Sequence, residues 1–502
     1  MARERNKRAT RPKKAAPRRL RRPARRAPRP RPRPAGRAPA PSVLVVNMIP
    51  KSLSGEEHQD SEPTIAVNPA NPRQIAASAF TPDPAEGPRA PIYVSIDGGN
   101  TWTLNSIVPS TVADGSATAD ITVAFGTTSN TLYAGIIRYP FPGDRTRLNI
   151  LRTKNFQDAA LMTVLVDRIG RGVDQPYVQA ATVTSGPAKG KDRIYVGDND
   201  FNGTGGKTAT IDQSLDAART KPTFSSVRIE SRTTSGQDGP SVRPAIHPDG
   251  TVYATFHAWR TFNDTTGAGT ADIVVVRADA GGAGPAPFTS LVDPGDGKAG
   301  MRVVKAAKFN FNGFLGLQRT GGDVSIAVDP RNSDVVYIAY NDDQGALYVL
   351  HVLRSTDRGQ TWSPELRHVN NALNPALAIN SAGKVGLLYQ QLTGSGAAQQ
   401  WVTRFETTTS GTAWTPLTLA QTPASTPPKQ FDPYLGDYDH LMAVGRDFYG
   451  IFSASNTPHK ANFPHGVVYQ RNANFNTNTL LNVDNVTPVH ASIDPFFFKV
   501  TG

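Results

Sequence analysis

The 502-residue chain contains no cysteine, so disulfide bonds and thiolate chemistry are excluded. No stretch approaches the roughly 20 apolar residues that a membrane-spanning helix needs, which predicts no transmembrane segment. No apolar run of about 7–15 residues follows the basic start, so no signal peptide is recognisable. The one nearby run, VLVV at Val43–Val46, is too short and indicates a strand. The compartment is therefore left open.

Other motifs are missing as well. The nine histidines show neither H-x-x-x-H nor H-E-x-x-H spacing, which argues against a zinc hydrolase. No G-x-x-x-x-G-K-[ST] phosphate loop occurs, and helical patterns are almost absent. By contrast, the chain has 44 glycines and 41 prolines with a modest hydrophobic content of 38%. Short strands separated by polar turns give this composition, which favours an all-β fold.

Positive charge is concentrated in residues 1–41, which hold 17 of the 54 basic and one of the 41 acidic residues. The remaining chain, residues 42–502, carries 37 basic and 40 acidic residues and is slightly acidic. Arginine and proline dominate the first segment, which has almost no residue able to join a core. We therefore predict a disordered basic arm over 1–41, partly polyproline II, and a folded domain over 42–502.

Two interpretations of this arm remain open. Each arginine or lysine can displace a counterion condensed on a polyanion, so the arm can contact nucleic acid, an acidic polymer or an anionic lipid surface. Alternatively, the arm is a solvated linker, or the start codon is misassigned. It contains no aromatic residue and therefore offers no platform for base stacking.

Seven related segments recur along the folded domain. Each combines a strand, a turn and a second strand, as in EPTIAVNPANPRQIAASAF from Glu62 and DVSIAVDPRNSDVVYIAYND from Asp323. They begin 51 to 82 residues apart, which is typical of four-stranded propeller blades with insertions. We predict an all-β fold, a seven-bladed β-propeller, with six blades as the alternative. The stretches Val43–Met48 and Ser492–Val500 are expected to form the seam that closes it.

One octet, S-x-D-x-G-x-T-W, occurs twice: SIDGGNTW at Ser95–Trp102 and STDRGQTW at Ser355–Trp362. Its aspartate can accept backbone N–H groups across the turn, and its glycine can take a positive φ. Its tryptophan can bury a large area beside the hairpin. Every part of the octet therefore has a role in folding. The predicted structural residues are Ser95, Asp97, Gly99, Trp102, Ser355, Asp357, Gly359 and Trp362.

This octet resembles the Asp-box of the sialidase-like β-propellers, also called the BNR repeat. A degenerate copy, TTTSGTAW at Thr407–Trp414, has Thr409 in place of the aspartate, and ADAGG at Ala278–Gly282 keeps only part of the pattern. The resemblance covers residues 43–502. It implies a propeller whose Asp-boxes lie away from an axial site, and it suggests a secreted or extracellular protein.

The resemblance also implies a sialidase site: three arginines for the sugar carboxylate, a tyrosine nucleophile backed by glutamate, and an aspartate acid/base. The early inner strand EPTIAV lacks the arginine that the family places there, and Arg89-Ala90-Pro91 precedes the strand of the first octet. The candidates that match by their order along the chain are Glu230 with Arg243, Tyr434 or Tyr438 as nucleophile, Asp83 as acid, and Asp437 as a further participant.

The residues that open the predicted inner strands form a second candidate site. In a propeller these positions surround one end of the central channel, and five of the seven are acidic. Such a ring favours a cation, an amine or neutral hydroxyls over a sialate. Alternatively, each carboxylate only caps its own strand. The positions are Glu62, Asp120, Asp174, Arg243, Asp323, Asn374 and Asp432, and the five acidic ones are the predicted binding ring.

The segment DPYLGDYDH at Asp432–His440 is a candidate site for a structural Ca²⁺, because carboxylates and carbonyls in a glycine-containing loop suit this ion. No cofactor is otherwise required. Two functions are expected as alternatives. One is a carbohydrate-active, sialidase-like exo-glycosidase that acts on a glycan or glycoconjugate at the axial end. The other is a non-catalytic propeller that binds a glycan or a protein and is tethered by its basic arm. The oligomeric state is left open.

Deleting residues 1–41 should leave the thermal unfolding temperature unchanged, because the arm supplies no core residue. The deletion should weaken binding to nucleic acid or another polyanion, and the difference should shrink as salt rises. Affinity measured at two salt concentrations checks this prediction. A truncated chain that binds as tightly as the full chain would contradict the tether.

Overall fold

The computed structural model describes residues 42–80, 92–109, 117–141, 145–171, 173–201, 208–233 and 242–502. The chain divides into two units, Met1–Ala40 and Pro41–Gly502, and every described residue belongs to the second. The predicted arm, Asp83 and Arg89 lie outside the described residues, so what the sequence predicts for them stays a prediction. Within the described part, no helix is long and apolar enough to cross a membrane.

Six sheets have four antiparallel strands each, joined in chain order. The first contains β2 (Ser61–Val67), β3 (Ile75–Phe80), β4 (Ile92–Ser95) and β5 (Thr103–Asn105). The second contains β6 (Ala117–Phe125), β7 (Leu132–Phe141), β8 (Arg145–Thr153) and β9 (Thr163–Arg171). The third contains β10 (Val173–Thr182), β11 (Asp192–Asp200), β12 (Ala209–Ser214) and β13 (Ser225–Arg228).

The fourth sheet contains β14 (Arg243–Ile246), β15 (Val252–Phe262), β16 (Ala268–Ala278) and β17 (Met301–Asn310). The fifth contains β20 (Val324–Val328), β21 (Val336–Asp343), β22 (Tyr348–Ser355) and β23 (Arg367–Asn370). The sixth contains β24 (Ala372–Ile379), β25 (Val385–Thr393), β26 (Gln400–Thr408) and β27 (Thr415–Pro423). The seventh has five strands, β28 (His440–Val444), β29 (Asp447–Ser455), β34 (Ile493–Val500), β1 (Val43–Asn47) and β30 (Val468–Tyr469).

Little else is regular. The described residues also include the short hairpin of β18 (Phe314–Leu315) and β19 (Gln318–Arg319). A small three-stranded sheet is made of β31 (Ala473–Asn474), β32 (Thr479–Leu481) and β33 (Pro488–Val489). The helices found in this part of the chain are three 3₁₀ turns, Lys51–Leu53, Gly396–Ala398 and Lys460–Asn462. The all-β prediction is confirmed.

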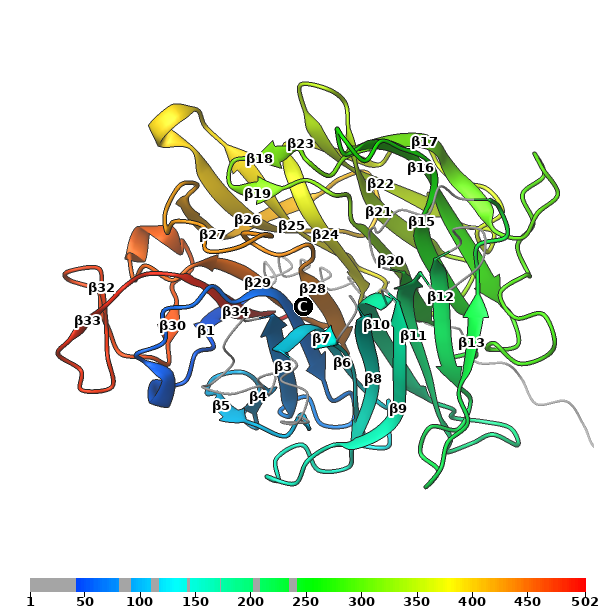
Figure 1. Ribbon diagram of the computed structural model, residues 1–502, viewed down its shortest axis with the longest axis horizontal. Helices are drawn as coiled ribbons and strands as arrows, with labels where there is room; N and C mark the ends of the chain where they lie inside the picture. Colours follow the sequence, from blue (N-terminus) through cyan, green and yellow to red (C-terminus); the bar gives the residue numbers. More distant parts are fainter. Residues whose placement is uncertain are drawn as a thin grey trace, which may run out of the picture. The chain divides into compact units, whose positions relative to one another are not determined.

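The sheets follow one another in chain order (Figure 1), and their first strands pack side by side. β2 packs against β6, and the same contact continues through β10, β14, β20, β24 and β28; β28 also packs against β2. Residues of all seven first strands line one cavity of about 220 Å³. The arrangement is therefore propeller-like, with a central cavity between the first strands.

The hydrophobic core lies between neighbouring sheets. A separate cluster of buried side chains joins each pair of successive sheets, and another joins the seventh sheet to the first. Because alternate residues of a strand point to opposite faces, a sheet packed on both sides needs apolar residues at nearly every position. Strands such as VSIAV and IYVS meet this need.

The two ends of the folded unit meet in the seventh sheet. β1 pairs antiparallel with β34, with Val43 opposite Val500 and Val46 opposite Phe497. On its other side β1 pairs in parallel with β30. The prediction that Val43–Met48 and Ser492–Val500 come together is confirmed, and the pairing covers a sheet edge that would otherwise be exposed.

Both octets form the same loop between the third and fourth strands of their sheets. In the first, the Asp97 carboxylate accepts hydrogen bonds from Asn100 N at 3.0 Å and from Thr101 N at 3.0 Å. The Thr101 hydroxyl donates to the same carboxylate at 2.7 Å, and the Trp102 indole N–H donates to the Gly99 carbonyl at 3.0 Å. Although partial burial raises the pKa of Asp97, these hydrogen bonds lower it below its ordinary value.

The second octet repeats these contacts around Asp357. Its carboxylate accepts from Thr361 N at 2.9 Å and from the Thr361 hydroxyl at 2.6 Å, and the Trp362 indole donates to the Gly359 carbonyl at 3.1 Å. The Ser355 hydroxyl donates to Asp357 at 2.8 Å, as Ser95 donates to Asp97 at 2.9 Å. All of these contacts are internal to the loops.

The glycine of each octet touches the preceding sheet. Gly99 has a φ of +93°, and a Cβ atom built on it would lie 2.1 Å from the ring of Phe497 in the seventh sheet. Gly359 has a φ of +84° and would place a Cβ atom 3.0 Å from Leu291, which belongs to the core between the fourth and fifth sheets. Only glycine combines this φ with this closeness, so the octets hold neighbouring sheets together.

Substituting Val46→Asp should lower the free energy of unfolding by about 3 kcal/mol or more, because it buries an unpaired carboxylate in the strand that closes the seventh sheet. Urea denaturation measures the change. The matched control is Val486→Asp at an exposed valine, which should change stability by less than about 0.5 kcal/mol. Equal effects at both positions would show that β1 is not part of the cooperative core.

Candidate functional site

The beginnings of the first strands meet at one end of the central cavity, and their polar side chains interact. The carboxyl groups of Glu62 and Asp120 share a hydrogen bond, and Asp120 makes a second one with Asp174. Glu62 and Asp120 are buried, and Asp174 is partly exposed. Two carboxyl groups can share a hydrogen bond only if one of them carries a proton. The three side chains therefore form a proton-holding cluster from three different sheets.

β-Bulges at the beginnings of three first strands orient polar side chains of the site. Glu62, Gln175 and Asn374 each precede a proline, and each has a positive φ between 50° and 54°. In each case the register with the second strand shifts at this point. A left-handed residue in a bulge turns its side chain out of the alternating pattern of the strand. This local geometry explains why the three side chains face the end of the cavity.

The segment Leu435–Asp439, called the capping loop below, crosses this end and leads into β28. Side chains from elsewhere in the fold hold its backbone: Glu62 accepts from Asp437 N at 3.2 Å, and Gln318 and Asn374 donate to the Gly436 carbonyl at 3.0 and 3.1 Å. Gly436 has a φ of +102°, and a Cβ atom there would lie 2.4 Å from the Glu62 nitrogen. Only glycine permits this approach.

The part of the cluster nearest to solvent is an ion pair. Arg319 of the β18–β19 hairpin contacts both carboxylate oxygens of Asp437, with an Nε–Oδ1 distance of 3.0 Å. The amide of Gln175 donates to Asp437 at 3.3 Å. The side chains of Arg319 and Asp437 are 34% and 19% exposed. The charge of Asp437 raises the pKa of Arg319.

A second group surrounds Arg243. Its guanidinium lies between the rings of Tyr177 and Tyr438, 4.2 and 4.8 Å from their centres, and donates to Asp323 at 3.1 Å. Within the described chain, Arg243 Nη1, Asp323 Oδ2 and the Tyr438 hydroxyl have no hydrogen-bond partner. Buried polar atoms normally have one, so this group has bonding capacity left for water or a ligand.

Burial shifts the titration of these groups. It raises the pKa of Glu62 to about 7 even though Asp120 donates to its charged form. It also raises the pKa of Asp120 well above its ordinary value, with the Glu62 charge adding to the effect. Burial raises the pKa of Asp323 to about 7 against the opposing influence of Arg243. At neutral pH the cluster therefore holds protons that exposed carboxylates would have lost.

The pKa values of Asp439, the last residue of the capping loop, and His440, the first residue of β28, are also shifted. Burial and the charge of Asp323 raise the pKa of Asp439. Burial and Arg243 lower the pKa of His440 to about 3. His440 is therefore neutral, and its Nδ1 accepts from Ile65 N at 3.2 Å.

The structure brings together Glu62, Asp120 and Asp174 of the predicted ring and places Asp323 beside Arg243 close to them. The prediction that Asp432 belongs to this ring is wrong. β28 begins at His440 rather than near Asp432, and the exposed Asp432 carboxylate pairs with Lys429 at 2.7 Å. The start of this strand was predicted too early because the segment DPYLGD resembles the sequences that open the other first strands. Asp439 directly precedes β28.

Tyr434 does not join the site either. Its side chain is buried in an apolar cluster, and its hydroxyl donates to the Pro427 carbonyl at 2.8 Å. Burial raises its pKa, which opposes a role as nucleophile. Tyr438, the other tyrosine considered, lies over Arg243.

Glu230 lies apart from Arg243. It accepts from Arg232 N at 2.7 Å and pairs with Arg260 at 3.4 Å, whereas Arg243 pairs with Asp323. Burial raises the pKa of Glu230, and the two arginines oppose this. Glu230 and Arg243, both candidates from their order along the chain, therefore have different partners, and their catalytic roles stay predictions. The third catalytic carboxylate, Asp83, lies outside the described residues.

The site also contains three residues that were not predicted from the sequence, Gln175, Gln318 and Arg319. A signal existed for Gln175, because Gln175-Pro176 repeats the Glu62-Pro63 and Asn374-Pro375 pairs. Gln318 and Arg319 lie on a short hairpin, and its two-residue strands are too short to give a recognisable hydrophobic pattern in the sequence. The calcium site predicted over Asp432–His440 stays a prediction, although two carboxylates of this segment, Asp432 and Asp437, already have cationic partners in Lys429 and Arg319.

Replacing the buried carboxyl in Glu62→Gln should change the pH dependence of stability. A raised folded-state pKa means that the native protein binds more protons than the unfolded chain between pH 4.5 and about 7. Stability contributed by this group is therefore present below pH 4.5 and lost as pH rises to 7. Wild type should lose about 1–3 kcal/mol more than the variant across this window. Urea unfolding at several pH values measures it, and parallel curves would contradict the shift.

No protein-family model matches the chain, and no curated protein matches it. Among solved structures, it is similar to an α-L-arabinanase of Penicillium chrysogenum, with 13% identity, a TM-score of 0.43 and coverage of 91% of this chain and 98% of that one.

It is also similar to the endosialidase of phage phi92, with 12% identity, a TM-score of 0.41 and coverage of 92% and 69%. Drosophila semaphorin 2a has 10% identity, a TM-score of 0.42 and coverage of 81% and 73%. Likenesses this distant select no activity, so function has to be argued from the site itself.

Proposed function

We propose that the seven sheets are the blades of a closed, seven-bladed β-propeller of the sialidase-like type. Three observations support the closed ring: the seventh first strand packs against the first, one cavity touches all seven, and an apolar cluster joins the seventh sheet to the first. Two S-x-D-x-G-x-T-W loops at equivalent places support the family type.

We further propose that the protein is a glycoside hydrolase that acts at the capping-loop end of the propeller. The observation that carries this proposal is a buried, proton-sharing pair, Glu62 and Asp120, directly beneath the partly exposed ion pair of Asp437 and Arg319. Glycosidases that use two carboxyl groups need one protonated and one ionised at the same pH, and different environments provide this.

In this mechanism Glu62 gives a proton to the leaving group and regains one from Asp120, with which it shares a hydrogen bond. Its pKa of about 7 lies near neutral pH, which is the most effective range for a general acid. Asp437, which is paired with Arg319, either activates water or stabilises positive charge that develops on the sugar. Gln175 and Arg319 offer donors to sugar hydroxyls.

The charge of the site favours a neutral or amino sugar over a sialate. In the described part of the cluster the arginines are Arg243 and Arg319, and each is already paired with a carboxylate. A sialate carboxylate needs cationic donors that are not committed elsewhere, and it would be repelled by the surplus of carboxyl groups.

A second candidate, a non-catalytic glycan-binding propeller, is favoured by one observation. The capping loop is anchored by Glu62, Gln318 and Asn374, so this end of the fold presents a fixed surface with little room around Glu62. A rigid surface of this kind suits recognition without chemistry.

A panel of fluorogenic glycosides tests the first candidate. We expect turnover of a neutral pentoside, hexoside or amino sugar and none of a sialoside. Glu62→Gln and Asp437→Asn should each lower kcat/KM by at least about 100-fold, the usual size of a general acid or base effect. The control is Asp432→Asn, an exposed carboxylate five positions away that should leave kcat/KM unchanged.

The same variants separate the two candidates. If wild type is inactive on the whole panel but binds a glycan, and Asp437→Asn abolishes that binding, the second candidate is correct. If Glu62→Gln and Asp437→Asn match wild type in both assays, neither function resides at the capping-loop end.

A further inference from the structure

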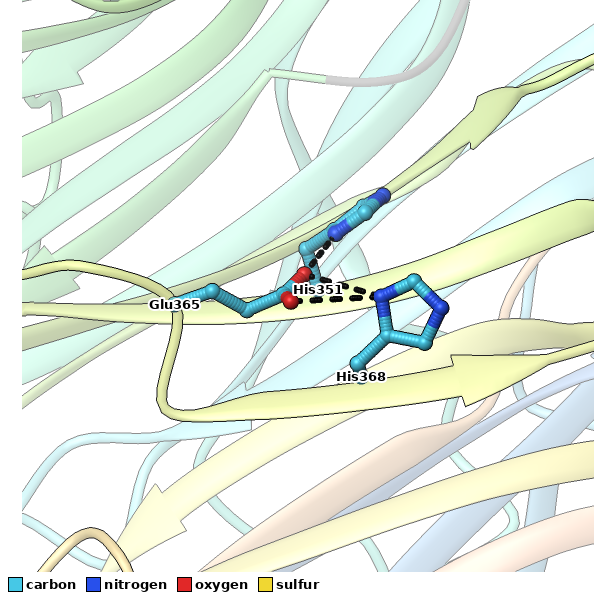
Figure 2. Close-up of side chains that lie close together, drawn as sticks. All are labelled: His351, Glu365 and His368. Atoms are coloured by element: carbon cyan, nitrogen blue, oxygen red, sulfur yellow. Dashed lines mark hydrogen bonds and ion pairs between the residues drawn. The ribbon is translucent and has the colours of Figure 1, made fainter.

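Two histidines and a glutamate converge on the outer strands of the fifth sheet, away from the first strands. β22 and β23 pair antiparallel with His351 directly opposite His368. Glu365 lies two residues before β23, and Figure 2 shows its carboxylate between the two imidazole rings. The Nδ1 atom of His368 is 3.2 Å from Glu365 Oε2, and the Nδ1 atom of His351 contacts Oε1. The three candidate ligand atoms all lie within 4.8 Å of one another.

The far side of each imidazole ring is occupied by an oxygen acceptor. His351 Nε2 is 3.0 Å from the Asp342 carboxylate, and His368 Nε2 is 2.9 Å from the Asn370 side-chain oxygen. The Gln344 amide lies farther from His351, at 3.4 Å. Because these oxygens only accept, each Nε2 carries the hydrogen and each Nδ1 of a neutral ring offers a lone pair. A carboxylate or carbonyl behind the ring is the usual arrangement for histidines that bind metals.

Three groups that carry lone pairs therefore face one another: two Nδ1 atoms and one carboxylate. Groups with lone pairs repel one another at this distance unless a cation lies among them, and the cation is either a proton or a metal ion. Burial alone would lower the pKa of His351, but its hydrogen bonds to Asp342 and Glu365 raise it. A proton on His351 relieves its contact with Glu365 and leaves the contact between His368 and Glu365 unrelieved. One metal ion relieves both.

The surroundings match a site with one open position. The side chain of His351 is 7% exposed and is backed by the Tyr340 ring at 4.7 Å, whereas Glu365 and His368 are 38% and 45% exposed. A cavity of about 450 Å³ is lined by Glu365, His368 and neighbouring residues. The histidines are fixed on paired strands, and Glu365 lies on the connecting segment, so its carboxylate can shift to admit an ion.

We propose that His351 Nδ1, His368 Nδ1 and the Glu365 carboxylate bind a divalent transition-metal ion of the Zn²⁺ class. Two imidazoles and one carboxylate are a ligand set that Zn²⁺ accepts in tetrahedral geometry, and the fourth position is left for water or a small anion. Spacing rules for histidines on one helix do not detect this site, because its histidines face each other across a hairpin and are 17 residues apart.

Titration of the metal-free, tag-free full chain with ZnCl₂ in a calorimeter tests the proposal. We expect one Zn²⁺ per chain, and Co²⁺ in its place should give the intense visible absorption of a tetrahedral ion. His368→Gln and Glu365→Gln should weaken Zn²⁺ binding at least about 100-fold, and Asp342→Asn about 10–100-fold because it only orients His351. The control, His490→Gln at an exposed histidine, should bind as wild type does.

The competing occupant, a proton, gives a different result. If wild type binds no Zn²⁺ at neutral pH, or if His368→Gln binds it as tightly as wild type, the proposal is overturned and a protonated His351 accounts for the cluster. Thermal unfolding without metal shows whether each variant is folded. Added Zn²⁺ should raise the unfolding temperature of wild type and leave that of His368→Gln unchanged.

Discussion

The interaction on which the rest of the structure depends is the packing of each sheet against the next. No sheet buries its own apolar residues, and the separate clusters between sheets include one that joins the seventh sheet to the first. The N-terminal β1 lies beside the C-terminal β34 and completes that last sheet. The S-x-D-x-G-x-T-W loops contribute to the same packing, because Gly99 and Gly359 leave room for side chains of the core beside them.

Lateral packing has an electrostatic consequence. It brings the beginnings of the first strands together, so carboxyl groups far apart in the sequence become neighbours in a buried place. Glu62, Asp120 and Asp323 cannot all be ionised there, since removing each from water is costly and the charges repel. The fold compensates by keeping protons on the cluster and by pairing Asp437 with Arg319 and Asp323 with Arg243. The chemistry proposed for this end depends on that compensation.

Much of the fold could be predicted from the sequence. Alternation, Asn/Asp-Pro turns and the repeated octets are local signals, and they identified the all-β class, the pairing of the two ends and four ring positions that lie in or beside the cluster. The site was harder, because it depends on loops between sheets. Asp432 and Tyr434 were chosen from a segment that only resembles a strand opening, whereas Arg319 comes from a two-residue strand. The cross-strand pair of His351 and His368 follows from register, which spacing along one strand does not reveal.

The central claim is that Glu62 lies in a buried cluster that shares protons. The chain has eight glutamates, so selective ¹³C labelling of glutamate carboxyl groups gives few signals, and Glu62→Gln identifies the one that belongs to Glu62. Titration of that signal by NMR is the most direct measurement. The account predicts a midpoint near pH 7. A midpoint near pH 4.5, the ordinary value for glutamate, would mean that Glu62 is solvated and would contradict the account.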